Sequence, residues 1–575
     1  MESGFGKVHP SPGASSRPFS VLVTSVLATN TVRDYRRFTI AAAGIAVLLI
    51  ATGCGGGGNA GVATGGNETA PPPPQQHAMV TTYRNNNNRT GVNSVETKLT
   101  PANVNVVSFG KLAAIPVLGD AYAQPLYMPN VTMSDGQLHN VVIVATEHDQ
   151  VYAIDATTRQ VLWQRSFLDS DGLVTPVPST DLTCEDITPE VGITGTPVID
   201  PAARTIYLVA RTKETQNGQA AYYQRLHVLR LSTGQDRLPP TTVVTPSDPN
   251  GGFGSAVFDP LLNNQRSALL LENGKVYVSW ASHCDSGTYS GWLMAFDSNT
   301  LQLTGAWAPD PSGLQGGIWM SGSGPAADST GDLYVAVGNG WSDVMLGGTN
   351  YGDALVRLHP GDAAMSVSDY FMPFDYQRFM NLDLDFGSGG PVLLPAQPGA
   401  MHSHLLVTSG KDGTVYLLDC DNLGKWHDGD DSQIVQSFQP TGGMGSYGTP
   451  AFWNNTVYFS FAGLPVQAYV YDPASQLIQT TPASGSSMNV LWPGSSPVVS
   501  ANGSSDAVLW TMEHTGGPGI LHAFDPANLT SELYDSQMSP DRDQVGIGLV
   551  FAVPTVADGQ VFVGAHNELD IYGLL

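Results

Sequence analysis

A short stretch that recurs in degenerate form constrains the fold of this chain more than any other feature. The stretch VYAIDATTRQVLW, at 151–163, has related copies at 226–234, 293–307, 415–426, 468–475 and 521–529. Each copy holds a short β-rich strand, then usually an Asp, then a turn and a second strand. A Pro-led strand and a Gly turn into another apolar strand precede most copies. Four strands per unit, at a spacing of about 40 to 75 residues, is typical of propeller blades.

The repeats predict an all-β, eight-bladed propeller of four-stranded antiparallel blades. Seven blades open on a proline and the eighth starts near Ser267 without one; the prolines are Pro125, Pro197, Pro325, Pro391, Pro450, Pro497 and Pro554. The last unit stops after three strands at Leu575. We expect the segment 109–117 to supply its missing outer strand, because pairing the two chain ends closes the ring and removes exposed sheet edges. Seven blades is the alternative count.

The N-terminal region divides into two segments before the propeller. In residues 1–54, Arg33, Arg36 and Arg37 precede an apolar run at 38–50 that ends near Cys54, as in a bacterial lipoprotein signal. Cys54 is the expected lipidation site, and cleavage without lipidation is the alternative. Residues 55–79 are rich in Gly and Pro and are expected to form a disordered tether. Residues 80–575 would then form the propeller of an exported protein, either periplasmic or a lipoprotein of the outer membrane or cell surface.

Charge and cysteine content limit the partners and cofactors. The chain has 24 basic and 50 acidic residues, and its net charge of -26 repels phosphate backbones and argues against nucleic-acid binding. A few of the acids could bind Ca²⁺. Cys184 and Cys284 lie in predicted loops and could pair in an oxidising compartment, whereas Cys420 follows a strand and is expected to be buried. No Cys-x-x-Cys-His motif occurs, so we expect no covalently attached haem.

The first repeat resembles the tryptophan-docking motif of the quinoprotein dehydrogenase family through Ala153, Asp155, Thr158 and Trp163. Two later copies carry similar pairs, Asp297 with Trp307 and Asp419 with Trp426. The resemblance to these proteins, which bind pyrroloquinoline quinone (PQQ), covers roughly residues 80–575 and concerns the fold. The same repeat also builds propellers that bind no quinone. We therefore interpret these Asp and Trp residues as structural groups that dock one blade on the next.

Loops between the second and third strands of the blades are expected to meet at one face with the connections between blades. These loops are 146–149, 211–214, 283–285, 339–343, 411–412, 513–514 and 566–568, and they hold His148, His283, His514 and His566. Two long connections add Glu190 and Trp319. A third, SDYFMPFDYQRFMNLDLDFGSGG, is aromatic and acidic, and a loop of this length is usually functional or disordered. A ring of His, acid and amide groups around one axis could hold a metal or a planar polar ligand.

Two functions fit these observations. As a binding module, the loop-rich face would hold an envelope protein, a glycan or a small molecule, with membrane contact only through the lipid anchor. As an enzyme, the resemblance implies oxidation of an alcohol or sugar by PQQ with Ca²⁺ and a carboxylate base. Glu190 and Asp285 are then the candidates for metal ligand and base, Trp319 for stacking, Lys411 for the quinone oxygens, and His283 and Asn339 for further cofactor contacts. No two cysteines are neighbours, which counts against the methanol-oxidising mechanism.

Overall fold

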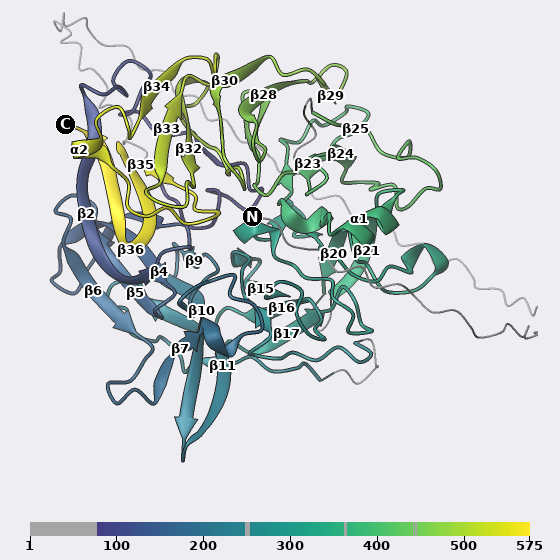
Figure 1. Ribbon diagram of the computed structural model, residues 1–575, viewed down its shortest axis with the longest axis horizontal. Coiled ribbons are helices and arrows are strands. Elements are labelled where there is room, and N and C mark those ends of the chain that lie inside the picture. Colours follow the sequence, from purple (N-terminus) through teal and green to yellow (C-terminus); the bar gives the residue numbers. More distant parts are fainter. Residues whose placement is uncertain (1–77, 248–252, 362–364, 441, 443–444) are drawn as a thin grey trace, which may run out of the picture. The chain divides into compact units, whose positions relative to one another are not determined.

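Eight antiparallel sheets surround a central axis in the computed structural model, which describes residues 78–247, 253–361, 365–440, 442 and 445–575 (Figure 1). The signal segment and nearly all of the predicted tether lie outside these residues. The first four blades contain, from the innermost strand outward, β3 (Leu126–Thr132), β4 (Leu138–Thr146), β5 (Gln150–Asp155) and β6 (Val161–Ser166); β9 (Val198–Asp200), β10 (Thr205–Gln216), β11 (Gln219–Arg230) and β12 (Thr241–Thr242); β14 (Leu270–Glu272), β15 (Lys275–Ser282), β16 (Trp292–Asp297) and β17 (Leu303–Trp307); and β18 (Ala326–Ala327), β19 (Leu333–Ala336), β20 (Leu355–Pro360) and β21 (Met365–Phe371).

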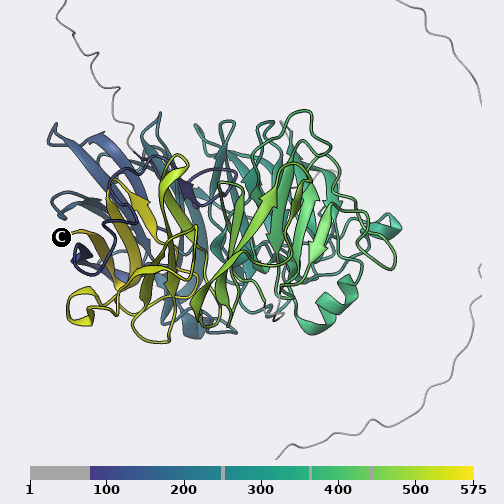
Figure 2. The ribbon, with the colours of Figure 1, turned by 90° about the horizontal axis from the view of Figure 1, so that it is seen from above.

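The second half of the ring repeats this arrangement. Its blades contain β22 (Val392–Leu393), β23 (Leu405–Ser409), β24 (Val415–Asp419) and β25 (Gln436–Phe438); β26 (Ala451–Trp453), β27 (Thr456–Ser460), β28 (Pro465–Asp472) and β29 (Leu477–Ile478); β31 (Val498–Asn502), β32 (Ser505–Glu513), β33 (Ile520–Phe524) and β34 (Glu532–Asp535); and β35 (Thr555–Ala557), β36 (Gln560–Leu574) and β2 (Phe109–Asp120). Four short strands pair outside this pattern, namely β7 (Val174–Pro178), β8 (Glu190–Val191), β13 (Asn263–Asn264) and β30 (Ser484–Asn489). In Figure 2 the strands run between two faces covered by loops.

The prediction of eight blades is confirmed, and the alternative of seven is wrong. Seven innermost strands begin directly after the prolines named above, and β14 begins at Leu270, close to Ser267. The predicted closure is also confirmed, because β2 pairs with β36 from Phe109 opposite Leu574 to Asp120 opposite His566. The last blade reaches four strands because β36 turns back at Asn567, whose φ is 57°, and Gly573 comes to lie beside Gly559.

Residues 80–93, which we call the axial plug, form hydrogen bonds with the innermost strand of every blade. The partners follow the order of the blades: Val80 with Tyr127, Thr81 with Ile199, Asn87 with Leu271 and with Ala327, Asn88 with Leu393, Thr90 with Phe452, Gly91 with Val499, and Asn93 with Val556. Each partner is the second residue of its strand. Within the plug, β1 (Val92–Asn93) pairs in parallel with β31. The plug therefore holds all eight blades at one level of the channel.

Two arginines of the plug, Arg84 and Arg89, are fully buried on the axis. Arg84 donates to the carbonyl oxygens of Pro450, at 2.6 Å, and Pro497, while Arg89 donates to that of Pro325 at 3.0 Å. Burial lowers the pKa of Arg84 to about 10 and that of Arg89 to about 9. The blade-opening prolines thus serve a second purpose, since their carbonyl groups satisfy buried guanidinium groups.

The docking interpretation of the Asp and Trp residues agrees with their contacts. Trp163 donates its indole N–H to the carbonyl oxygen of Leu231 in the next blade, at 2.9 Å. Trp307 is buried, and the centre of its ring lies 6.0 Å from that of Tyr351. Trp426 donates its indole N–H to the carbonyl oxygen of Phe374 at 3.2 Å. The carboxylates of Asp155, Asp297 and Asp419 accept backbone N–H groups of the turns that follow them. These residues stabilise turns and blade contacts.

One predicted loop is wrong. Residues 211–214 lie inside β10, whose pairing with β11 continues to Gln216 opposite Gln219. Asn217 and Gly218 make the turn, and this Asn-Gly sequence is a strong hairpin signal that places the turn further along the chain. The hairpin projects from the ring in Figure 1. The helices of the described residues are short, with α1 (Tyr376–Leu382) and α2 (Pro540–Asp543), and none of them is long and apolar enough to cross a membrane.

Candidate functional site

A cavity of about 590 Å³ lies on the propeller axis, and residues from six of the eight blades or their connections line it. The lining residues used below are Tyr122, Asp186, Asn264, Arg266, Cys284, Asp285, Trp319, Asn339, Asp383, Asp385, Lys411 and Phe551. Eight of them lie in connections that lead to the innermost strand of a blade, whereas the axial plug contacts the second residue of each such strand. The plug therefore closes the channel beneath the cavity, which leaves the loop-rich face as the way in.

Two aromatic rings and two positively charged side chains form a continuous row in the cavity. The rings of Trp319 and Phe551 meet edge to face with their centres 6.1 Å apart. The guanidinium carbon of Arg266 lies 5.4 Å from the centre of the Phe551 ring and 5.6 Å from that of Tyr122. At the other end of the row, the ammonium of Lys411 lies 5.7 Å from the centre of the Trp319 ring. Such rings stabilise a cation and offer flat surfaces for a ligand.

Three carboxylates, Asp285, Asp383 and Asp385, gather beside Lys411, with one oxygen of each within 4.8 Å of the others. Lys411 forms ion pairs with Asp385 at 2.7 Å and Asp383 at 3.0 Å. Burial alone would lower the pKa of Lys411, but the two aspartates raise it above its usual range. Burial raises the pKa of Asp285, and the charge of Asp385 adds to this effect. We call Asp285, Asp383 and Asp385 the aspartate group.

A glycine allows the aspartate group to approach the aromatic row. A Cβ atom at Gly338 would lie 2.6 Å from Asp385 and 3.3 Å from the indole nitrogen of Trp319. The following residue, Asn339, donates its backbone N–H to Asp385 and its amide N–H to Asp383, both at 2.6 Å. Side chain and backbone at 338–339 therefore hold two of the three carboxylates in place.

Three lining residues are nine-tenths or more buried and carry polar atoms with no hydrogen-bond partner among the described residues. The atoms are Oδ1 of Asn264, Nη2 of Arg266 and Oδ1 of Asn339. The residues are 3%, 7% and 5% exposed, respectively. Buried polar atoms are nearly always paired in folded proteins, so three unpaired ones on a single cavity wall point to a bound polar partner.

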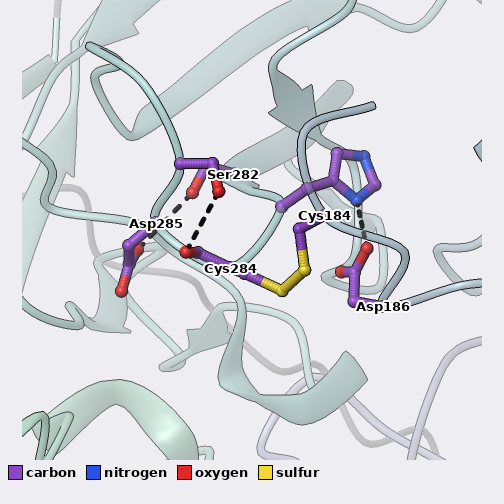
Figure 3. Close-up of a disulfide and its surroundings, with 7 residues drawn as sticks. Cys184, Asp186, Ser282, Cys284 and Asp285 are labelled. Atoms are coloured by element: carbon purple, nitrogen blue, oxygen red, sulfur yellow. Dashed lines mark hydrogen bonds and ion pairs between the residues drawn. A yellow bond between two sulfur atoms is a disulfide. The ribbon is translucent and has the colours of Figure 1, made fainter. Parts of the chain in front are cut away.

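A disulfide joins Cys184 to Cys284 at the cavity rim, with 6.1 Å between their Cα atoms, as the sequence suggested (Figure 3). In Figure 3, Asp285 lies on one side of the disulfide and Asp186 on the other. Arg211 donates to Nε2 of His283 at 2.6 Å, so the other ring nitrogen carries the proton that Asp186 accepts at 2.7 Å. The buried His283 thus lies behind the wall and orients Asp186.

The structure brings four of the six predicted site residues into this cavity, namely Asp285, Trp319, Asn339 and Lys411. His283 supports the wall, and Glu190 lies elsewhere. Glu190 accepts from His148 at 2.6 Å and lines a separate cavity of about 150 Å³, which His566 also lines. Glu190 and Asp285 therefore do not share a site in this structure, and a cation near Asp285 would be held by the aspartate group.

Sequence reasoning missed Arg266, Asn264 and Phe551, and it named the connection that carries Asp383 and Asp385 without selecting these residues. Arg266 lies where the third blade lacks the opening proline of the others. This break in the repeat is a signal that could have identified it. Phe551 lies in an irregular turn before β35, and no spacing pattern marks it.

No family model matches the chain, and no curated protein is significantly similar to it in sequence. Solved structures do match, and among them is a quinohemoprotein alcohol dehydrogenase from Comamonas testosteroni, with a TM-score of 0.58, 14% identity, and coverage of 86% of this chain and 80% of that one. A quinohemoprotein alcohol dehydrogenase from Pseudomonas putida HK5 gives a TM-score of 0.53 at 13% identity, with the same coverage. A europium-containing methanol dehydrogenase gives 0.54 at 13% identity, covering 86% of this chain and 98% of that one. The likeness confirms the quinoprotein-type propeller fold, and at these identities it shows the fold alone.

Proposed function

We propose that this protein binds a small polar molecule in its axial cavity and works outside the cytoplasm. The observation that carries this proposal is the set of unpaired buried atoms on Asn264, Arg266 and Asn339. Each unpaired buried polar group costs on the order of 1 to 3 kcal/mol. A ligand that paired with them would recover that cost. The volume of the cavity is within the usual range for small-molecule sites.

An extracytoplasmic location is part of this proposal. The Cys184–Cys284 disulfide supports it, because such bonds persist mainly in oxidising compartments. The signal-like segment that ends at Cys54 agrees with it and lies outside the described residues. Mass spectrometry of the protein from bacterial envelopes tests both points, since it measures the disulfide and any lipid on Cys54.

Ligand binding can be tested with the purified protein and a library of small organic acids, sugars, peptides and quinones, with the melting temperature as the readout. We expect at least one class to raise the melting temperature, and we expect Arg266→Met to remove that shift. Arg230→Met is the matched control, because Arg230 is exposed and does not line the cavity. If no class shifts the wild-type protein, or if Arg266→Met leaves every shift intact, the axial cavity is not the binding site.

A second candidate function is that of a PQQ- and Ca²⁺-dependent dehydrogenase. It is favoured by the meeting of the aspartate group, Trp319 and Lys411 in one cavity of this fold. The aspartate group suits Ca²⁺, because its three carboxylates outnumber the one ammonium beside them. Carboxylate oxygens are the ligands that Ca²⁺ prefers. The quinone, when bound, would accept the hydride of an alcohol or sugar. Trp319 would support a planar ring, Lys411 would donate to ring oxygens, and Asp285 would accept the substrate's hydroxyl proton.

Titration with PQQ and Ca²⁺, followed by dye reduction with a panel of alcohols and sugars, separates the two candidates. Stoichiometric quinone binding with substrate-dependent reduction would establish the dehydrogenase. Binding of another ligand class without any response to quinone would leave the binding module. Trp319→Leu serves as a probe in either case, because it removes the flat surface and keeps an apolar side chain.

A further inference from the structure

The axial cavity carries opposite charges at the two ends of its aromatic row. Arg266 lies beside Phe551 and Tyr122, and the aspartate group lies beyond Trp319. We propose that the cavity binds a short zwitterionic peptide of two or three residues, with its carboxylate on Arg266 and its terminal ammonium on the aspartate group. This inference rests on the small-molecule site proposed above and names its ligand class.

At the cationic end, Arg266 is free to bind an anion. It is 7% exposed, and among the described residues it has no hydrogen bond and no ion pair. Two acids, Glu147 and Asp186, act on its charge without forming an ion pair with it, and each accepts a hydrogen bond from another group. Glu147 accepts from the backbone N–H of Gly192 at 2.7 Å and Asp186 accepts from His283. A guanidinium matches a carboxylate with two parallel hydrogen bonds, so a terminal carboxylate is the natural ligand.

At the anionic end, the acceptors outnumber the donors. Lys411 pairs with Asp383 and Asp385, which leaves Asp285 without an ion pair, although Asp285 accepts from the hydroxyl of Tyr289. The amide of Asn339 donates to Asp383, so its unpaired Oδ1 is left as an acceptor beside the group. A primary ammonium donates three hydrogen bonds and accepts none, and it would find carboxylate and amide oxygens here.

The Phe551 and Trp319 rings lie between Arg266 and Lys411, so a ligand that contacts both ends extends along the aromatic row. No ion pair within 4.0 Å joins Arg266 to the aspartate group among the described residues, and contacts of 5.4, 6.1 and 5.7 Å link Arg266 to Lys411 through two rings. In an α-amino acid the charged groups flank a single carbon atom. Each extended residue adds roughly 3.3 to 3.6 Å, so a peptide of two or three residues separates its charged ends further along the row than an α-amino acid does.

An uncharged acceptor favours a peptide over other zwitterions of that length. The unpaired Oδ1 of Asn264 lies on the cavity wall two positions from Arg266 in the sequence. A peptide offers N–H groups between its charged ends, whereas an ω-amino acid offers only methylene groups there. The Phe551 and Trp319 rings provide apolar surface for side chains.

The test is calorimetric titration of the purified full-length protein with Ala-Ala-Ala, in buffer that contains a chelator. We expect binding by the free peptide and a loss of about tenfold or more in affinity when either the carboxylate is amidated or the amine is acetylated. Arg266→Met should abolish the difference between the acid and the amide, and Asp285→Asn should shrink the difference between the amine and its acetylated form. Arg230→Met should preserve both differences. Arg266→Gln, which removes the charge and keeps a polar side chain, covers the case in which Arg266→Met does not fold.

Several results would overturn the inference and leave the proposed function intact. They are equal binding of free and blocked peptides, equal binding of 6-aminohexanoate, and binding of quinones or organic acids without binding of Ala-Ala-Ala. A requirement for added Ca²⁺ would assign the aspartate group to a metal and also overturn it. If none of the ligand classes binds, the inference and the proposed function fail together.

Discussion

The ammonium of Lys411 lies 2.7 Å from Asp385 and 5.7 Å from the centre of the Trp319 ring. It therefore joins the two halves of the cavity, because it neutralises part of the aspartate group and occupies the end of the aromatic row. The side chain is about one-sixth exposed, so water screens these contacts only in part. The charge of Lys411 should consequently control which cations the cavity accepts.

The first prediction concerns this charge. Lys411→Met should raise the affinity of the aspartate group for Tb³⁺ on the order of tenfold, because the substitution removes one positive charge from a poorly screened site. Terbium luminescence excited through tryptophan measures the change, since Trp319 lies beside the group. Lys213→Met is the control, because Lys213 pairs with Asp181 in another part of the molecule. Equal Tb³⁺ affinity in the wild-type and Lys411→Met proteins would contradict the prediction.

The second prediction concerns the axial plug. Arg84→Met removes hydrogen bonds to Pro450 and Pro497 and leaves both buried carbonyl groups unpaired. We expect a loss of roughly 2 to 5 kcal/mol in the free energy of unfolding. Urea denaturation measures it as a lower midpoint at unchanged slope. Arg230→Met, at an exposed position, should change the free energy by less than about 0.5 kcal/mol. Equal midpoints for the two variants would show that the plug does not hold the blades.

Repetition explains why the fold was predictable from the sequence. The strand after each proline and the Asp of each turn recur, so the blade count and the closure by β2 follow from pattern alone. The plug recurs nowhere. Its Asn and Arg residues bond to strands that follow them by as many as 463 positions, as Asn93 does with Val556. No local rule of propensity or periodicity contains such a contact.

The site was predictable only in part for the same reason. Asp285, Asn339 and Lys411 follow the second strands of their blades, and the repeat places such residues at one face. Arg266 and Phe551 precede blades three and eight, which lie only three positions apart once the ring is closed, so their contact depends on that closure. Glu190 was selected as an acid in a long connection, but its pairing with His148 depends on how that connection folds back.

The third prediction concerns the disulfide. The Cys184–Cys284 bond closes a loop with a sequence separation of 100 residues, for which the chain-entropy account gives about 4.7 kcal/mol of stabilisation. A variant with both residues changed to Ala should unfold at lower urea concentration and, because Cys284 lines the cavity, bind ligand more weakly. Reducing agent should destabilise the wild-type protein and Cys420→Ala but leave the double variant unchanged. Sensitivity of the double variant to the reducing agent would contradict the assignment of the effect to this bond.

The fourth prediction concerns Glu147, which interacts electrostatically with Arg266 and is 1% exposed. Burial raises the pKa of Glu147 from 4.5 to about 7, against the opposing hydrogen bonds from Gly192 and Thr194. Because the folded protein holds this proton to higher pH than the unfolded chain does, the contribution of Glu147 to stability falls as pH rises from about 4.5 to 7. The loss is on the order of 3 kcal/mol across that range.

Glu147→Gln isolates this contribution, because its amide oxygen can still accept from Gly192 and Thr194 while no proton is taken up. We expect the free energy of unfolding of the variant to fall less than that of the wild-type protein between pH 4.5 and 7, as measured by urea midpoints at each pH. Glu185→Gln is the control, since the side chain of Glu185 is exposed. Parallel pH profiles for the wild-type and Glu147→Gln proteins would mean that Glu147 is ionised in the folded state, and the charge of Arg266 would then be balanced from within the protein.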